Sequence, residues 1–412
     1  MNEAVAGNSP ARQALKEASL LILLFLLLFF RNSRIFLFPE PWAEDMAVFL
    51  RAEYVTGFPD TAFSLYAGYI HLLPRIIAWL SLKTGFEHAM YVMNWSVLLV
   101  KLLTCLLICR SKEIPSSPIK GAIIAYLVLM PFADEVYSNV TNLQWWLIPL
   151  MGVIIIHQEK SAASLTLSAV ILVLTGLTGV NSVMFALPCA FLILKDRSPA
   201  SIIKNSIVIL CGAVQLYFLL STGRGAAGSM AFEGGTADLI CIFVKRVIFH
   251  TLFKSDTPLL LSIPVLGAFI ALAALNLRRY RKLRAVQFIA LFAAVYTAVI
   301  FYNLTKSEKD PSVLLTTFSG ERYFVFLRLL TFVLIVSSLD LLFRSARLLG
   351  HYKKLMAVTF LVFAVLLARR YPVRFPSGSE YYADIAKFEA AKPGDTVTIH
   401  FPPDWKCDLR KK

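Results

Sequence analysis

The sequence predicts an all-α polytopic membrane protein. We expect about 11 transmembrane helices, a large first extracytoplasmic loop and a short extracytoplasmic C-terminal tail. Of the 412 residues, 58% are hydrophobic and only 16% are charged, whereas soluble domains carry about 25% charged residues. The apolar residues form runs near the length of about 20 residues that a helix needs to cross a bilayer. The net charge of +15 comes from basic residues clustered between these runs, which is typical of membrane anchoring and argues against nucleic-acid binding.

The hydropathy pattern places the spans and the topology. The segment 62–82 is ambiguous, and we expect it to lie along the membrane or to re-enter it. That choice puts the most basic loop, "RRYRKLR", in the cytoplasm, as the positive-inside rule requires. The N-terminus is then inside and the C-terminus outside. The predicted spans lie near residues 18–37, 88–109, 121–133, 144–157, 163–179, 182–194, 206–221, 258–277, 285–303, 323–343 and 355–369.

This topology gathers the long polar loops on one face, where we expect the protein to work. These segments are 38–87, 134–143, 222–257 and 304–322, together with the tail. We divide the chain into a transmembrane domain, 1–369, and an extracytoplasmic tail, 370–412. In the tail, "SEYYADIAKFEAA" predicts a short helix and the alternation in "TVTIHF" predicts a strand. We expect the tail to pack on the outer loops.

Two adjacent carboxylates, Glu44 and Asp45, follow the first span in "FPEPWAEDMAVFLRAEY". A carboxylate in a partly desolvated site can act as a general base, and oxygen ligands of this kind can bind a divalent cation such as Mg²⁺ or Mn²⁺. The structural alternative is an N-cap for the helix predicted in "MAVFLRAEYV". The two roles are compatible.

The second outer loop, "PFADEVYSNVTNLQWWLIP", carries another acidic pair. Aromatic rings can stack on a sugar while amides and carboxylates bind its hydroxyls, so this loop is a candidate sugar or acceptor site. The tryptophans could equally belong to the interfacial aromatic belt. The candidate residues are Asp134, Glu135, Asn142, Gln144 and Trp145, with Tyr323 from a later loop.

Cationic side chains near the same face are candidates for binding a phosphate. Arg322 in "GERYF" lies at the outer mouth of a late span, where it could grip a phosphate with its planar fork or snorkel to the interface. His71 and Arg75 are four residues apart, so on a helix they share one face. Arg328 lies further inside the span and should not face lipid, because an unpaired charge there costs several kcal/mol. Lys101 is another intramembrane charge, without an assigned role.

Motifs of common soluble enzymes are missing. The sequence has no Walker loop, no G-x-G-x-x-G after a strand, no H-E-x-x-H and no G-x-S-x-G. Its six cysteines show no metal or redox spacing. Because no cradle for nucleotide phosphates is present, any transferred group is expected to come from a membrane-borne donor.

Several stretches resemble a known superfamily: "WAEDMAVFL", "YAGYIHLLPRIIAWL", "TNLQWWL", "LTGLTGVNSVMFALP", "GERYF" and "VTIHFPPDW". Together with the span-loop-bundle plan, they resemble the GT-C superfamily of polyprenyl-phosphate-sugar-dependent glycosyltransferases, and within it a bacterial branch that modifies surface polysaccharide and O-antigen. The resemblance implies an inner-membrane enzyme with an active site on the periplasmic side. Its donor would be a polyprenyl-phosphate-linked sugar, and its acceptor a lipid-linked or surface glycan.

The resemblance also implies roles for the site residues. Asp45 would deprotonate the acceptor hydroxyl, and Glu44 would orient the acceptor or a metal, with the metal left open. Arg322 would neutralise the leaving phosphate, and the product would have inverted stereochemistry. The alternatives are a polysaccharide polymerase or ligase, and a flippase or transporter of lipid-linked sugars. A transporter usually shows internal repeats, and none is visible here.

Overall fold

The computed structural model is mainly helical. It describes residues 10–114, 116–132, 134–222, 233–252, 259–307, 310–315, 320–345, 351–368 and 380–412. Five of the described helices are long and apolar enough to cross a membrane, at Phe86–Arg110, Pro199–Ser221, Leu261–Tyr280, Arg284–Lys306 and Glu321–Arg344. These helices indicate an integral membrane protein. The predicted boundary between the two domains, at residues 369 and 370, lies outside the described residues.

A helix occupies each of the eleven predicted span positions. They are α1 (Pro10–Arg31) with α2 (Arg34–Leu37), α5 (Phe86–Arg110), α6 (Ser117–Leu129), α7 (Leu143–Ile156), α8 (Ala162–Gly176), α9 (Asn181–Lys195), α10 (Pro199–Ser221), α12 (Leu259–Tyr280), α13 (Arg284–Ser307), α15 (Val325–Ser345) and α16 (Tyr352–Ala368). The helices themselves agree with the sequence analysis. Eleven crossings and their topology stay a prediction, since α6 to α9 are shorter than a full span.

Shorter elements build the loops. The ambiguous segment 62–82 forms the hairpin β1 (Leu65–Tyr66) and β2 (Tyr69–Ile70), followed by α4 (Leu72–Leu82). With 11 residues, α4 is about 16 Å long and cannot cross a bilayer alone. The other short elements are α3 (Arg51–Val55), α11 (Thr236–Phe243), α14 (Pro311–Leu315), the π-helical turns η1 (Asp45–Leu50) and η3 (Val244–Ile248), and the 3-10 turns η2 (Asp134–Val136), η4 (Phe249–Thr251) and η5 (Glu321–Phe324).

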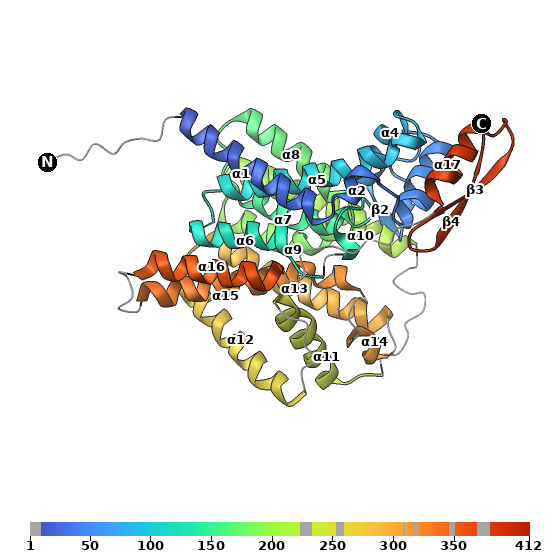
Figure 1. The fold of residues 1–412 in the computed structure, drawn as a ribbon. Helices are drawn as coiled ribbons and strands as arrows, with labels where there is room; N and C mark the ends of the chain where they lie inside the picture. Colours follow the sequence, from blue (N-terminus) through green and yellow to red (C-terminus); the bar gives the residue numbers. More distant parts are fainter. Residues whose placement is uncertain are drawn as a thin grey trace.

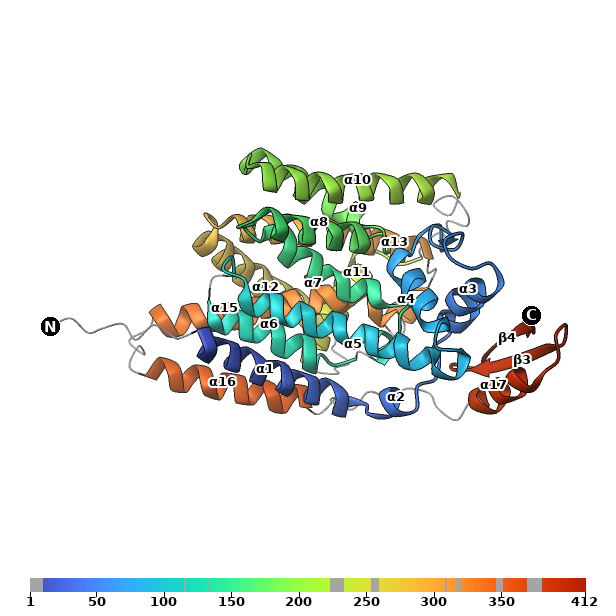
Figure 2. The same cartoon turned by 90° about the horizontal axis from the view of Figure 1, so that it is seen from above.

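The chain is mainly α-helical, as the sequence predicts, and two small antiparallel sheets accompany the helices. In the tail, α17 (Tyr381–Ala390) packs on the hairpin of β3 (Thr396–Phe401) and β4 (Trp405–Arg410). The predicted strand "TVTIHF" is therefore confirmed. Figures 1 and 2 show this tail at one end of the molecule, beside α3 and α4. The tail packs on the loop formed by residues 38–87, the first outer loop of the predicted topology. Ala43 of this loop donates its N–H to the Pro402 carbonyl at 2.8 Å.

Serine caps start three helices of the bundle. The side chains of Ser116, Ser161 and Ser198 each accept a bond from the backbone N–H three residues later, and a proline in the first turn helps α6 and α10. The helices then pack in a bundle in which α10 lies along one edge and α1 and α16 lie along the opposite edge (Figure 2). Between them, α7 is buried along nearly its whole length.

Candidate functional site

Asp45 is fully buried at the start of η1. Its Oδ1 accepts bonds from the Thr141 N–H at 2.8 Å and the Thr141 hydroxyl at 2.6 Å, and its Oδ2 accepts from the Val140 N–H at 3.3 Å. Burial raises the pKa of Asp45 to about 7, although these bonds oppose the shift. The carboxyl thus joins the first outer loop to the second. The predicted capping bond is not made by either acidic residue of the pair.

Glu44 is the more accessible member of the pair. It is half-buried, and it accepts a bond from the Tyr66 hydroxyl of β1 at 2.9 Å. Its charge also acts on Arg322, a residue that is 278 positions further along the chain. Glu44, in the loop 38–87, and Arg322, in the turn before α15, therefore lie within electrostatic reach of each other.

Arg322 forms an ion pair with Glu135 across this site. Its Nη1 lies 2.5 Å from Glu135 Oε1, and the two side chains are 36% and 21% exposed. Burial raises the pKa of Glu135, and the Arg322 guanidinium opposes this shift. The guanidinium also lies 5.1 Å from the Tyr323 ring centre, and that ring makes a T-shaped contact with Trp145. A partly exposed cation is thus held between the Glu135 carboxylate and the Tyr323 ring.

Below this surface lies a buried ionic cluster that consists of Arg246, Glu321 and Arg328. Glu321 Oε1 is 3.2 Å from Arg246 Nη2, and its Oε2 pairs with Arg328 Nη2. Both guanidinium groups stack near the Phe324 ring. The expectation that Arg328 avoids lipid is confirmed, since it is 0% exposed. Sequence reasoning missed Arg246, although its place in the apolar stretch "FVKRVIFH" carried the same signal as Arg328.

His71 and Arg75 lie behind the first outer loop and do not reach its surface. Both are buried, and the Phe49 ring contacts both, with centres 5.6 Å from the His71 ring and 4.9 Å from the Arg75 guanidinium. Burial lowers the pKa of His71 to about 3, so its ring is neutral near pH 7. Arg75 donates to the Val48 carbonyl at 3.1 Å. These contacts explain both residues as supports of η1, while their predicted role toward a phosphate stays a prediction.

Asn142 and Gln144 make structural contacts of the second loop. Asn142 Nδ2 donates to the Glu135 carbonyl at 2.9 Å, which fixes the turn that presents Glu135. Gln144 packs against Gly179, where φ is +81° and an added Cβ would lie 2.1 Å from Gln144 Oε1. Asp134 lies half-buried in η2 next to Glu135. Their predicted contacts with a sugar stay predictions.

The motif "LTGLTGVNSVMFALP" binds the segment that contains the hairpin of β1 and β2. Its Gly179 N–H donates to the Ile70 carbonyl at 3.1 Å, and the Leu72 N–H donates to the Leu177 carbonyl at 3.0 Å. Gln215 of α10 bonds Ile70 on both its N–H and its carbonyl, at 2.9 and 3.0 Å. The hairpin that carries Tyr66 is thereby anchored to the bundle. Neither Tyr66 nor Gln215 was identified from sequence.

Lys101 is buried in the bundle, where it contacts a carbonyl and two aromatic rings. Its ammonium group donates to the Tyr137 carbonyl and lies 4.1 and 4.0 Å from the ring centres of Tyr137 and Trp146. Such cation–π contacts make a buried charge tolerable inside the bundle.

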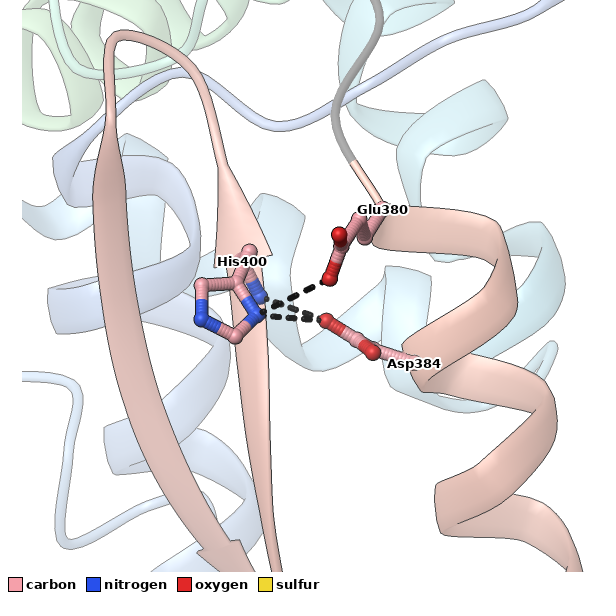
Figure 3. A group of neighbouring side chains, drawn as sticks. All are labelled: Glu380, Asp384 and His400. Carbon is pink, nitrogen blue, oxygen red and sulfur yellow. Dashed lines mark hydrogen bonds and ion pairs between the residues drawn. The ribbon is translucent and has the colours of Figure 1, made fainter.

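A possible metal-binding group occurs in the tail, away from the predicted Glu44–Asp45 position. It consists of Glu380, which directly precedes α17, Asp384 of α17 and His400 of β3 (Figure 3). Asp384 Oδ2 accepts from the backbone N–H and lies 2.8 Å from Nδ1 of His400, while Oδ1 accepts from Lys387 at 2.8 Å. Glu380 lies 3.8 Å from the same Nδ1. A mixed nitrogen and oxygen set suits a zinc-like ion better than Mg²⁺, but the contacts already satisfy Asp384.

No protein-family model matches the chain, and no curated protein matches its sequence. Among solved structures, the chain is similar to the Archaeoglobus fulgidus oligosaccharyltransferase in complex with zinc and sulfate, with 12% identity and a TM-score of 0.43. The match covers 90% of this chain and 55% of the oligosaccharyltransferase, so the chain spans about half the length of that protein.

Proposed function

We propose that the chain is an inverting membrane glycosyltransferase that moves a sugar from a polyprenyl-phosphate carrier to a glycan or glycolipid acceptor. The observation that carries this proposal is the ion pair of Arg322 with Glu135, which lies within electrostatic reach of Glu44. The three residues come from three segments far apart in sequence. A cation that can bind a phosphate thus shares one region of the molecule with a carboxylate that can take a proton. This is the pair of charges that transfer from a phosphate-linked sugar requires.

In this proposal Glu44 is the general base. The acceptor hydroxyl loses its proton to Glu44 as its oxygen forms a bond to the anomeric carbon. The bond from that carbon to the donor phosphate breaks on the opposite face, and the electron pair leaves with the phosphate. We prefer Glu44 to Asp45 because Asp45 is fully buried and both its oxygens are bound to residues 140 and 141. Asp45 then positions Glu44 by holding the two loops together.

Arg322 receives the leaving phosphate. Its fork geometry can donate two parallel bonds to phosphate oxygens. In the described structure this fork is directed to Glu135, so a bound donor would have to compete with that carboxylate. Tyr323 is the candidate stacking surface for the sugar ring, because it is half-buried next to Arg322, and the buried Trp145 supports it through a T-shaped ring contact.

The location that we propose is the outer face of the bacterial cytoplasmic membrane, with surface polysaccharide or O-antigen as the acceptor class. Orientation can be tested apart from activity. A cysteine introduced at Asp404, in the exposed turn of the tail, should react with an impermeant thiol reagent added to whole cells, whereas one at the exposed Lys282 should not. Labelling at 282 with silence at 404 would contradict an outer site. Wild-type protein measures the background of the native cysteines.

The test of the function is release of free polyprenyl phosphate from a lipid-linked sugar donor by the purified protein. We expect release by the wild type, near-complete loss in Glu44→Gln and no change in Glu87→Gln, which alters an exposed carboxylate at the start of α5. A transporter would move the lipid-linked sugar across vesicles without releasing polyprenyl phosphate. Equal release by wild type and Glu44→Gln would refute the assigned base.

A further inference from the structure

A polar cavity lies at the end of the bundle opposite the candidate site. Its volume is about 580 Å³, and it is lined where α7 and α9 end and where α8, α10 and α13 begin. Helix α7 runs from the candidate site, at Leu143, to this cavity, at Ile156. Its 14 residues separate the two places by about 20 Å. The cavity is therefore distinct from the site around Arg322.

An apolar cavity adjoins the polar one. It has a volume of about 770 Å³ and runs between α6, α7, α12, α13 and α15, with aromatic walls that include Phe185, Phe269 and Phe288. Three residues, Glu113, Ile156 and Ala285, line both cavities. A polar space that opens directly beside an apolar one fits an amphipathic ligand, because each part of the ligand finds a matching environment.

One ion pair of the polar cavity is already satisfied within the protein. Lys204 lies 3.1 Å from Glu159 Oε1 and also donates to the carbonyls of Ile154 and His157. Glu159 accepts further bonds from Ser164 and Ser168. These contacts close the end of α7 and build the cavity wall. Because Lys204 and Glu159 neutralise each other, this pair does not determine which ligand the cavity binds.

The charges at the junction of the two cavities are more available. Arg284 precedes Ala285, and it pairs with Asp196 through Nη1 only, with 39% of its side chain exposed. A guanidinium has five N–H donors, so it can bind a phosphate as well. Glu113 lines both cavities, and its charge acts on Lys204, but among the described residues no hydrogen bond to its carboxylate is formed. The junction thus presents one cationic group and one anionic group next to an apolar space.

We propose that this double cavity binds one phospholipid whose head group carries both a phosphate and a primary ammonium group. Arg284 binds the phosphate, Glu113 binds the ammonium, and an acyl chain fills the apolar cavity. A polyprenyl-phosphate donor fits less well, because it has no ammonium group for Glu113. Its phosphate would also belong at Arg322, about 20 Å away by the length of α7.

The chain offers a variant that blocks the acyl chain while leaving the fold intact. Gly152 lies in α7 on the wall of the apolar cavity, and an added Cβ there meets no atom within 4 Å. Gly152→Leu should fill the cavity and should also favour the helix. The double variant Glu113→Gln with Arg284→Ala removes the two head-group contacts, and Glu87→Gln serves as the matched control on the exposed start of α5.

The experiment measures binding of phosphatidylethanolamine to detergent-purified protein by native mass spectrometry, and requires no transfer activity. We expect one bound molecule in the wild type and the control, and binding weaker by at least about tenfold in Gly152→Leu and in the double variant, with unchanged unfolding temperatures. Phosphatidylglycerol, which lacks the ammonium, should bind the wild type more weakly. Equal binding by all variants, binding of polyprenyl phosphate in its place, or no bound lipid would overturn the proposal.

Discussion

Two neighbouring residues of one turn, Glu321 and Arg322, end in opposite environments. Glu321 is 3% exposed and shared between two buried arginines, whereas the Arg322 side chain is 36% exposed and paired with one half-buried carboxylate. Gly320 precedes them in the left-handed region, at φ +59°. This lets the chain turn so that one side chain enters the bundle and the next stays at its surface.

The difference separates two uses of charge. In the inner cluster of Arg246, Glu321 and Arg328, every member is bound by protein and none can meet a ligand. In the outer group of Glu44, Glu135 and Arg322, the same kinds of side chain keep part of their surface open. Arginine and glutamate side chains therefore have a structural role in the inner cluster and a candidate catalytic role in the outer group.

The inner cluster should control folding most strongly. Glu321→Gln leaves two buried guanidinium groups without their counter-charge, and removal of one partner of a buried pair typically costs about 3–5 kcal/mol. We expect little monodisperse protein after detergent extraction and a much lower unfolding temperature. The control Glu87→Gln should behave as the wild type. If Glu321→Gln unfolds at the same temperature as the wild type, the inner cluster is not required for folding.

The outer carboxylate should control the reaction and leave the fold unchanged. Glu44→Gln keeps an oxygen that can accept from Tyr66 but removes the base, so we expect transfer to fall by about 100- to 10,000-fold. The unfolding temperature should stay near that of the wild type. Steady-state kinetics with a lipid-linked sugar measure the first effect, and thermal unfolding measures the second. Tyr66→Phe, which removes only the bond to Glu44, should have a smaller effect on the rate.

The outer arginine should act mainly on turnover. Arg322→Lys keeps the charge and loses the planar fork, and loss of a donor that stabilises developing charge typically costs about 100- to 1000-fold in rate. We expect the drop to appear in kcat more than in donor binding, with a further loss in Arg322→Ala. Rates within a few-fold of the wild type would leave Arg322 as an interfacial anchor. His71 and Arg75 would then be the remaining candidates for binding the phosphate.

The smallest expected effect concerns Asp45 and pH. Its pKa is raised from 3.8 to about 7 in the folded state, so the folded protein binds a proton that the unfolded chain releases. This contributes stability at low pH that is lost as pH rises through about 7. The wild type should therefore gain unfolding temperature relative to Asp45→Asn as pH falls from 7.5 to 5. If the difference in unfolding temperature between the wild type and Asp45→Asn does not change with pH, then Asp45 is ionised over this whole pH range and its three hydrogen bonds stabilise the carboxylate.

The sequence could predict the helices because each one is a local pattern of apolar residues. All eleven positions contain a helix, and the strand "TVTIHF" also follows from local alternation. The convergence of Glu44, Glu135 and Arg322 was predicted only as a shared face, through the topology and the family resemblance. No local signal could show that Arg322 turns to Glu135, or that Asp45 points inward to Thr141.

The sequence by itself determined the class of the protein, the places of its helices and the loops in which the candidate site lies, because hydropathy and charge act residue by residue along the chain. Only the tertiary structure decided which member of each charged pair is buried. Asp45 and Glu321 lie inside, and Glu44 and Arg322 lie at the surface. That choice depends on partners about 75 to 95 positions away, Val140, Thr141 and Arg246. It follows from the energy of burying a charge, which only a folded partner can offset.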